Sequence, residues 1–393
     1  MEGRTSLNRT LRFQILALAL TRLFINTMFR MVYPFLGVFR DNLGVSLSQL
    51  SLTMTARAVM STVGPFIAAM ADQRGRKVVV GLGLVLFAAG VSLVILLPNF
   101  LGFFLLVTLT MLSRNIFDPA MYAFIGDHVP YNRRGLVLAF TELSWSMSFV
   151  IVMPIIGLLI AGQGWLAPFP WLLLFSLAAL VILARILPGG PPTQSMRSNT
   201  WLNLGTVLRS APALAGLSVG LSFSAANEVV NLVFGVWLED SFGVKVAALG
   251  AASLVLGLAE LGGEFFVGGL TDRLGKVRSL ALGLMLNCVV VLALPILGRT
   301  LIGAVIGLFF FYLTFEFTIV SNLPLMTEVL PAARATLMAA SYASMSIGRA
   351  MGAALASPLY SQGILASGIA TVAFNLLALL ALRRVRLAFG ANR

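Results

Sequence analysis

Charge is scarce in this sequence. Charged residues make up 10% of the chain, and only 14 Asp and Glu stand against 27 Lys and Arg. A soluble domain carries roughly 25% charged residues, so the composition argues against a soluble enzyme. Cys288 is the single cysteine, which excludes an intrachain disulfide and a cysteine-cluster metal site. One histidine and no phosphate-cradling glycine loop leave no recognisable catalytic set, so we expect no enzyme activity, metal or cofactor.

Apolar residues are abundant instead, at 59% of the chain with a mean hydropathy of +0.97. A helix needs about 20 apolar residues to cross a bilayer. Twelve runs of about that length occur, centred near residues 25, 58, 87, 113, 148, 176, 225, 257, 288, 313, 348 and 374. The period-two alternation of a β-barrel is missing. The sequence therefore predicts an all-α integral membrane protein with twelve transmembrane helices.

Basic residues lie mainly at the N-terminus, in the loops after even-numbered spans and at the C-terminus. Examples are Arg74, Arg76, Lys77, Arg133, Arg134, Arg185, Arg197, Arg209, Arg273, Lys276, Arg278, Arg334, Arg383, Arg384 and Arg386. Only Arg40, Lys245 and Arg299 fall on the opposite side. By the positive-inside rule this asymmetry predicts a multi-pass protein of the cell membrane with both termini in the cytoplasm. The net charge of +13 then reflects the orientation of the chain in the membrane, and we expect no nucleic-acid partner.

The chain repeats itself at an interval of about 200 residues. Residues 68–77, AAMADQRGRK, return as residues 268–278, GGLTDRLGKVR. Residues 127–133, DHVPYNR, return as residues 328–334, EVLPAAR. Between the copies, a Pro- and Gly-rich break predicts a cytoplasmic linker over residues 188–210, which divides the chain into six-helix bundles at residues 1–187 and 211–393. Duplicated halves in a membrane chain point to a transporter with its site between two bundles.

The first repeated motif resembles the loop signature of the major facilitator superfamily, Gly-x-x-x-Asp-Arg-x-Gly-Arg-Lys/Arg, and the resemblance covers almost the whole chain. The first copy departs from the pattern at Ala68 and Gln73, whereas the second keeps Gly268. The motif style is closest to proton-coupled transporters of drugs and organic solutes. The resemblance implies two bundles related by a pseudo-two-fold axis and transport by alternating access. It also implies that the motif residues gate the cytoplasmic side, namely Asp72, Gly75, Arg76, Asp272, Arg273 and Gly275.

Two further motifs resemble family patterns. Arg114 matches the arginine of an Arg-x-x-x-Gly motif in span four, which in proton-coupled relatives is implicated in proton handling; here Asp118 replaces the glycine. Residues 153–157, MPIIG, resemble part of a Gly-Pro-x-x-Gly motif found in exporting antiporters, with the first glycine missing. The second likeness favours export slightly over uptake.

Ionisable residues within the apolar spans carry the functional information, because each costs roughly 3 kcal/mol at mid-helix unless it faces a partner or a wet cavity. In span one, Arg22, Asn26, Arg30 and Tyr33 fall within an arc of roughly 80° at helical spacing, just before Pro34, where a kink is expected. Guanidinium groups bind carboxylate or phosphate in a bidentate manner. We therefore expect an anionic, zwitterionic or amphiphilic organic solute to bind Arg22, Asn26, Arg30, Tyr33, Arg57, Asn227 and Asn231. The alternative is that each arginine pairs with a buried acid and only holds helices together.

The second half carries acids in place of arginines. Glu260 and Glu264 are four residues apart on one helical face, so both cannot ionise cheaply in an apolar setting, and at least one should hold a proton near neutrality. The residues expected to couple protons to transport are Glu260, Glu264, Glu316, Arg114, Asp118 and Arg349. An ion pair of Arg349 with Glu264 or Glu316 is the structural alternative.

Two other functions stay open. A lipid or lysolipid flippase would use the arginines on a headgroup phosphate, and a lateral opening lined by apolar residues would favour it. A membrane receptor or assembly subunit could retain the fold without transporting. The first choice is a monomeric secondary transporter whose partners are a small molecule, protons and the lipid bilayer.

Overall fold

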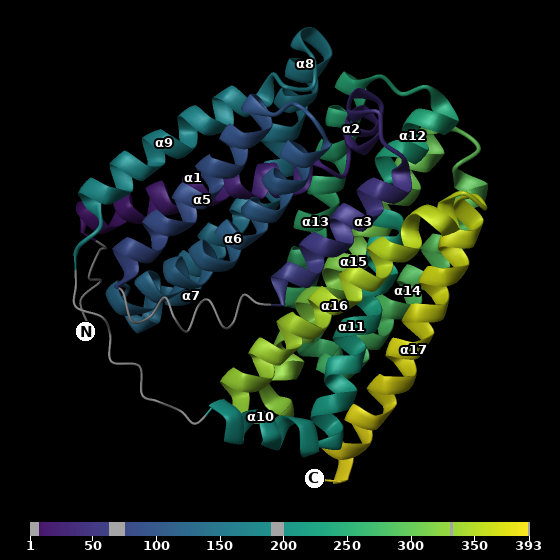
Figure 1. Ribbon diagram of the computed structural model, residues 1–393. Helices are drawn as coiled ribbons and strands as arrows, with labels where there is room; N and C mark the ends of the chain where they lie inside the picture. Colours follow the sequence, from purple (N-terminus) through teal and green to yellow (C-terminus); the bar gives the residue numbers. More distant parts are fainter. Residues whose placement is uncertain (1–7, 63–74, 190–199, 331–332, 392–393) are drawn as a thin grey trace. The chain divides into compact units, whose positions relative to one another are not determined.

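Helices make up all the regular structure in the part of the chain that the computed structural model describes, residues 8–62, 75–189, 200–330 and 333–391. They are α1 (Arg9–Met31), α2 (Leu36–Leu43), α3 (Leu47–Ser61), α5 (Arg76–Leu96), α6 (Phe100–His128), α7 (Tyr131–Met147), the π-helical turn η1 (Ser148–Val152), α8 (Met153–Gln163), α9 (Pro168–Ile186), α10 (Thr200–Arg209), α11 (Ala211–Asn231), α12 (Phe234–Phe242), α13 (Val246–Leu274), α14 (Lys276–Leu297), α15 (Leu301–Val329), α16 (Arg334–Tyr360) and α17 (Ile364–Ala391) (Figure 1).

Ten helical segments within the described residues are long and apolar enough to cross a membrane. They correspond to ten of the twelve predicted spans. The remaining two predictions fall on α3, with 15 residues, and on α16, with 27 residues that include Arg349. The prediction of an all-α, multi-pass membrane fold is therefore confirmed.

The chain divides by contacts into two compact units. Unit 1 comprises Met1–Val32 and Val63–Ser195. Within it, α1 packs against α6, α7 and α9, and α5 packs against α6 and α9. The stacked rings of Phe24 and Phe175, with centroids 4.3 Å apart, fix α1 on α9. The second half of α1, which is buried from Ile25 to Met31, thus packs among other helices of this unit.

Unit 2 comprises Tyr33–Thr62 and Met196–Arg393. Its core joins α11, α14, α15, α16 and α17 through Val219, Leu284, Phe315, Met345 and Leu382. A seam of hydroxyl contacts joins α3 to α16. Ser48 and Ser61 form hydrogen bonds of 3.0 Å with Ser357 and Ser346, respectively. Residues 33–62 therefore pack with the C-terminal helices, whereas the sequence analysis groups them with residues 1–187; the predicted bundle boundaries stay a prediction.

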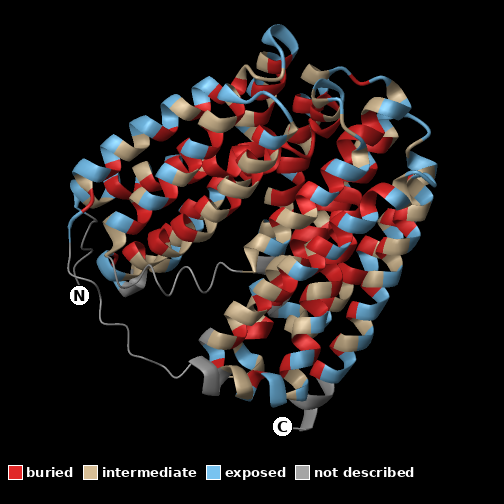
Figure 2. Cartoon of the chain, in the orientation of Figure 1, coloured by how far each residue is buried: buried red, intermediate tan, exposed pale blue. Residues whose placement is uncertain are grey.

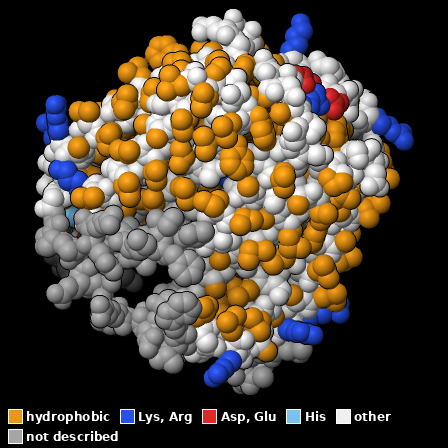
Figure 3. All heavy atoms as spheres, viewed as in Figure 1, with side chains coloured by type: hydrophobic (Ala, Val, Ile, Leu, Met, Phe, Trp, Pro, Cys, Tyr) orange, Lys and Arg blue, Asp and Glu red, His pale blue; other side chains and the backbone are white. Residues whose placement is uncertain are grey.

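The surface of both units suits a lipid environment. Buried residues (red in Figure 2) lie where helices of one unit meet, and exposed residues lie along the outward faces. In Figure 3, hydrophobic side chains (orange) dominate the visible face, and most Lys and Arg side chains (blue) lie at its edges. Exposed apolar side chains occur in the middle of long helices, such as Leu82 on α5 and Leu177 on α9. Such apolar outward faces are expected where lipid replaces water.

The sequence repeat is visible in the helix ends. Gly75 begins α5 with φ of 82° and Gly275 begins α14 with φ of 80°, a backbone region that glycine enters without strain. Arg76 then pairs with Asp127 at 3.3 Å in unit 1, and Lys276 pairs with Glu328 in unit 2. The two repeated motifs of each half therefore contact one another. Asp72 lies outside the described residues, and so does the side chain of Asp272.

The predicted break near Pro34 is also present. α1 ends at Met31, residues 32–35 form a turn, and α2 begins at Leu36. Proline lacks the backbone N–H that a helix interior needs, which explains the interruption. Tyr33 consequently lies beyond the end of α1 and does not continue the helical stripe of Arg22, Asn26 and Arg30.

Candidate functional site

Arg22 is the centre of a polar network in unit 1. Its side chain is 3% exposed and reaches two carboxylates, Asp118 of α6 at 3.2 Å and Glu142 of α7 at 3.1 Å. It also donates hydrogen bonds to the hydroxyl of Tyr122 at 2.7 Å and to the carbonyl oxygen of Thr141 at 3.0 Å. Tyr122 in turn donates to Glu142 at 2.6 Å. This network supplies the ionic partners that a buried guanidinium requires.

Asp118 joins two arginines. One carboxylate oxygen faces Arg22, and the other accepts a hydrogen bond from Arg114 at 3.3 Å, one helical turn earlier on α6. The i, i+4 spacing places the two side chains on one face of the helix. Asp118 therefore faces both Arg22 and Arg114. Asp118, which stands where the family motif has a glycine, bridges two arginines and is not an isolated charge.

Arg30 lies among aromatic rings. Its guanidinium carbon is 3.4 Å from the ring centroid of Phe149 and 4.2 Å from that of Trp145, and it donates a hydrogen bond to the Trp145 carbonyl oxygen at 2.8 Å. Arg114 lies against the same tryptophan, 4.7 Å from its centroid. Cation–π contacts of this kind stabilise a charge in an apolar setting without neutralising it.

A π-helical turn positions Phe149. The turn η1 covers Ser148–Val152, and Pro154 lies near the start of α8. Proline cannot donate the usual hydrogen bond, and a single wide turn is one way to accommodate it. The π-helical turn before this proline thus places Phe149 beside Arg30.

Arginines outnumber carboxylates among these residues of unit 1. Three arginines, Arg22, Arg30 and Arg114, lie with two carboxylates, Asp118 and Glu142. Asn26 lies one turn from both Arg22 and Arg30 and donates from its amide to Ser144 at 3.3 Å.

Unit 2 holds a second buried polar network. Arg57 of α3 donates to the hydroxyl of Tyr33, which donates to Glu228 of α11 at 3.0 Å. Asn231 donates to the other oxygen of Glu228 at 3.4 Å and accepts a hydrogen bond from Tyr312 of α15. Glu228 is 2% exposed. A series of hydrogen bonds therefore connects Arg57 to Tyr312 through Tyr33, Glu228 and Asn231.

The predicted carboxylates of spans eight and ten come together around a close helix contact. A Cβ on Gly263 of α13 would lie 2.8 Å from the Cβ of Glu316 on α15, so only glycine allows this approach. Glu260 and Glu264 lie on the same helix, before and after that glycine. Glu260 and Glu316 are both buried. Glu316 therefore packs against the segment of α13 that carries Glu260 and Glu264.

The remaining predicted residues are dispersed. Arg57 belongs to unit 2 and lies with Tyr33 and Glu228, whereas the sequence analysis places it with the arginines of the first half. Asn227 is buried, and its amide oxygen has no hydrogen-bond partner among the described residues. Arg349 is half-buried on α16. Within the described residues, no group of three or more His, Cys, Asp or Glu side chains could hold a metal ion.

Sequence reasoning missed several members of these networks. It did not single out Tyr122, Trp145, Phe149 or Tyr312. One signal in the sequence could have found some of them. Intervals of three and four residues separate Glu142, Trp145 and Phe149, which places them on one helical face of α7 and η1.

Comparison with known proteins agrees with this description. Residues 18–353 match the family model described as Major Facilitator Superfamily. The MFS-type transporter YceJ of Bacillus subtilis is 29% identical over 337 residues, which cover 84% of each chain. The sialic acid transporter NanX of Escherichia coli is 22% identical over 265 residues, 65% of this chain and 64% of NanX.

Solved structures show the same fold. A bacterial homologue of the human lysosomal transporter Spinster, in an inward-facing and unoccupied conformation, matches with a TM-score of 0.77 at 15% identity, over 98% of this chain and 96% of that chain. A D-xylose-proton symporter matches with a TM-score of 0.75 at 14% identity, over 95% and 96%. At such identities the likeness concerns the fold alone.

Proposed function

The chain belongs to the Major Facilitator Superfamily, and on that premise we propose that it is a proton-coupled secondary transporter of a small organic anion that works by alternating access. The chain is a multi-pass membrane transporter and not an enzyme. The proposal assigns anion binding to the arginines of unit 1 and proton binding to the carboxylates of unit 2.

The observation that carries the proposal is the unequal charge of the two units. Among the described residues, the spans of unit 1 hold three arginines against two acids, whereas those of unit 2 hold Arg57 and Arg349 against Glu228, Glu260, Glu264 and Glu316. An excess of carboxylates in an apolar medium favours proton uptake by at least one of them. An excess of arginine favours an anion.

Arg30 is the best candidate for direct contact with the anion. Asp118 and Glu142 already face Arg22, and Asp118 also faces Arg114. The contacts of Arg30 include two ring faces and one carbonyl oxygen. Its charge is therefore shielded from water by Trp145 and Phe149, and a carboxylate entering beside it would gain a strong interaction. Asn26, one turn away, offers an amide for a second polar group of the solute.

The names of relatives support the substrate class and the coupling. NanX is a transporter of sialic acid, and a structural neighbour is a xylose-proton symporter. The first name fits an anionic organic solute, and the second fits coupling to a proton. Export is the direction favoured by the Pro154–Gly157 segment, and both termini are placed in the cytoplasm by the distribution of basic residues. The residues proposed to gate the cytoplasmic side are Asp72, Gly75, Arg76, Asp272, Arg273 and Gly275.

A ligand-stability screen tests the anion proposal. Carboxylates, each paired with its neutral amide, are added to purified protein together with sialic acid and xylose, and thermal unfolding is followed. We expect at least one carboxylate, and not its amide, to raise the unfolding temperature. In Arg30→Gln its affinity should fall about tenfold, which corresponds to roughly 1.4 kcal/mol.

The control for Arg30→Gln is Arg299→Gln, because Arg299 is an exposed arginine of a loop. It should bind the same carboxylate as the unaltered protein does. Equal stabilisation by acids and amides, or unchanged affinity in Arg30→Gln, would contradict the assignment.

A further inference from the structure

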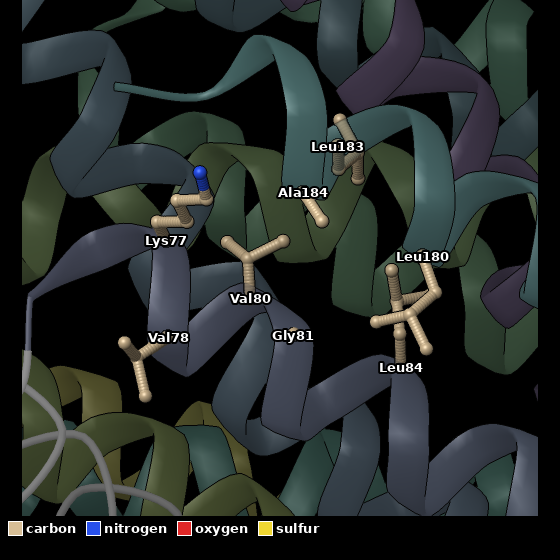
Figure 4. A pocket seen from close by; sticks show the side chains of 8 residues that line it. All are labelled: Lys77, Val78, Val80, Gly81, Leu84, Leu180, Leu183 and Ala184. Atoms are coloured by element: carbon tan, nitrogen blue, oxygen red, sulfur yellow. The ribbon is translucent and has the colours of Figure 1, made fainter. Parts of the chain in front are cut away.

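A groove opens between α5 and α9 of unit 1, and none of the residues that line it belongs to the polar network of Arg22. Its floor and walls are apolar apart from one lysine, and its volume is about 230 Å³. The lining residues are Lys77, Val78, Val80, Gly81, Leu84, Leu180, Leu183 and Ala184 (Figure 4). This volume is below the roughly 300–1,000 Å³ of pockets that enclose a drug-sized ligand. The groove is thus an elongated surface feature and not a second solute pocket.

The helical spacing shows how the groove forms. Lys77, Val80, Gly81 and Leu84 recur at three and four residues along one face of α5. A Cβ on Gly81 would still lie 3.9 Å from the Leu180 side chain, so the missing side chain leaves open space at this point. Neighbouring residues of both helices point outward, such as Val85 of α5 at 49% exposed and Val181 of α9 at 50% exposed. The groove therefore faces the bilayer.

One end of the groove is basic. Figure 4 shows the amino group of Lys77 at the end near Leu183 and Ala184, opposite the end formed by Leu84 and Leu180. Arg185 follows in the last turn of α9 and is exposed. Arg76 is engaged by Asp127, whereas Lys77 has no ion pair with a described residue. The positively charged amino group of Lys77 therefore lies at the end of the apolar groove where α5 begins and α9 ends.

We propose that an anionic phospholipid occupies this groove, with one acyl chain along Gly81 and its phosphate beside Lys77. An acyl chain matches the apolar lining and the bilayer-facing position. A phosphate matches the lysine, because basic residues between transmembrane helices attract anionic headgroups. This site is separate from the proposed transport path, so it does not depend on the proposed function.

Lipid retention by the purified, full-length protein tests the site. Native mass spectrometry follows the number of lipids retained from phosphatidylglycerol and from phosphatidylcholine with the same acyl chains. We expect the unaltered protein to retain phosphatidylglycerol about fivefold more strongly, and Lys77→Gln to lose that preference. Gly81→Phe should fill the groove and reduce retention of both lipids. Gly81→Leu is the milder variant if Phe lowers the yield of folded protein.

Two controls match these variants. Val85→Phe adds the same ring to an outward position of α5, and Lys245→Gln removes an exposed lysine elsewhere. Both should retain lipid as the unaltered protein does. Equal retention of the two lipids, or unchanged retention in Gly81→Phe, would overturn the proposal. Displacement of phosphatidylglycerol by inorganic phosphate would also overturn it, because a free anion would then be the occupant. Dimer formation on delipidation, if Gly81→Phe prevents it, would do the same, because a second copy of the chain would then be the occupant.

Discussion

Replacing Glu228 with glutamine should abolish transport driven by a pH gradient while leaving exchange of labelled for unlabelled substrate intact. Glutamine keeps the size of the side chain, and its amide oxygen can still accept the hydrogen bond from Tyr33, but it cannot take up or release a proton. Glu228 is 2% exposed and lies between Tyr33 and Asn231, so a change in its charge cannot be screened by water. Accumulation driven by the gradient should fall to background in proteoliposomes.

Two variants make that result specific. Asp240→Asn removes an exposed carboxylate from α12 and should keep gradient-driven transport. Tyr33→Phe removes the hydroxyl that links Arg57 to Glu228 and should shift the pH dependence of transport without abolishing it. If Glu228→Gln transports uphill as well as the unaltered protein, the proton carrier is among Glu260, Glu264 and Glu316, and the role given to Glu228 is wrong.

The second large effect is expected at Asp118. Asp118→Asn removes the carboxylate shared by Arg22 and Arg114, so one buried and one half-buried guanidinium group lose an ionic partner. Breaking a buried ion pair costs about 3–5 kcal/mol, and the free energy of unfolding in mixed micelles should fall by about 3 kcal/mol or more. Transport should fall with it, because Arg114 also lies against Trp145 beside Arg30.

Glu142→Gln is the matched control for Asp118→Asn. Glu142 faces the same arginine at nearly the same distance, but its side chain is 46% exposed against 14% for Asp118. Water can replace part of the lost interaction, so this variant should cost about 1 kcal/mol or less. Equal destabilisation by the two substitutions would show that Asp118 is not the main counter-charge of Arg22.

The fold was largely predictable because hydropathy and the internal repeat are strong, local signals. The length of apolar runs located the spans, and the doubled motifs showed that the chain consists of two similar halves. The pair of Arg114 with Asp118 was predictable for the same reason, because it depends only on a four-residue spacing within one helix.

The membership of the two networks was not predictable, because it depends on which helices pack together. Arg22 meets Asp118 across 96 positions of sequence, and Tyr33 meets Glu228 across 195. A helical stripe shows which face of a span is polar but not what lies opposite. The turn after α1 removed Tyr33 from the stripe with Arg30, and the packing of α3 on α16 placed Arg57 in unit 2.

The central claim is that a proton bound in unit 2 drives the movement of an anion bound in unit 1. Its most direct test is substrate-induced proton movement in proteoliposomes that enclose a pH-sensitive dye, using the carboxylate that stabilises the protein best. The account predicts that adding this carboxylate moves protons with the unaltered protein and with Asp240→Asn, but not with Glu228→Gln. Carboxylate flux that moves no protons and ignores an imposed pH gradient would contradict it.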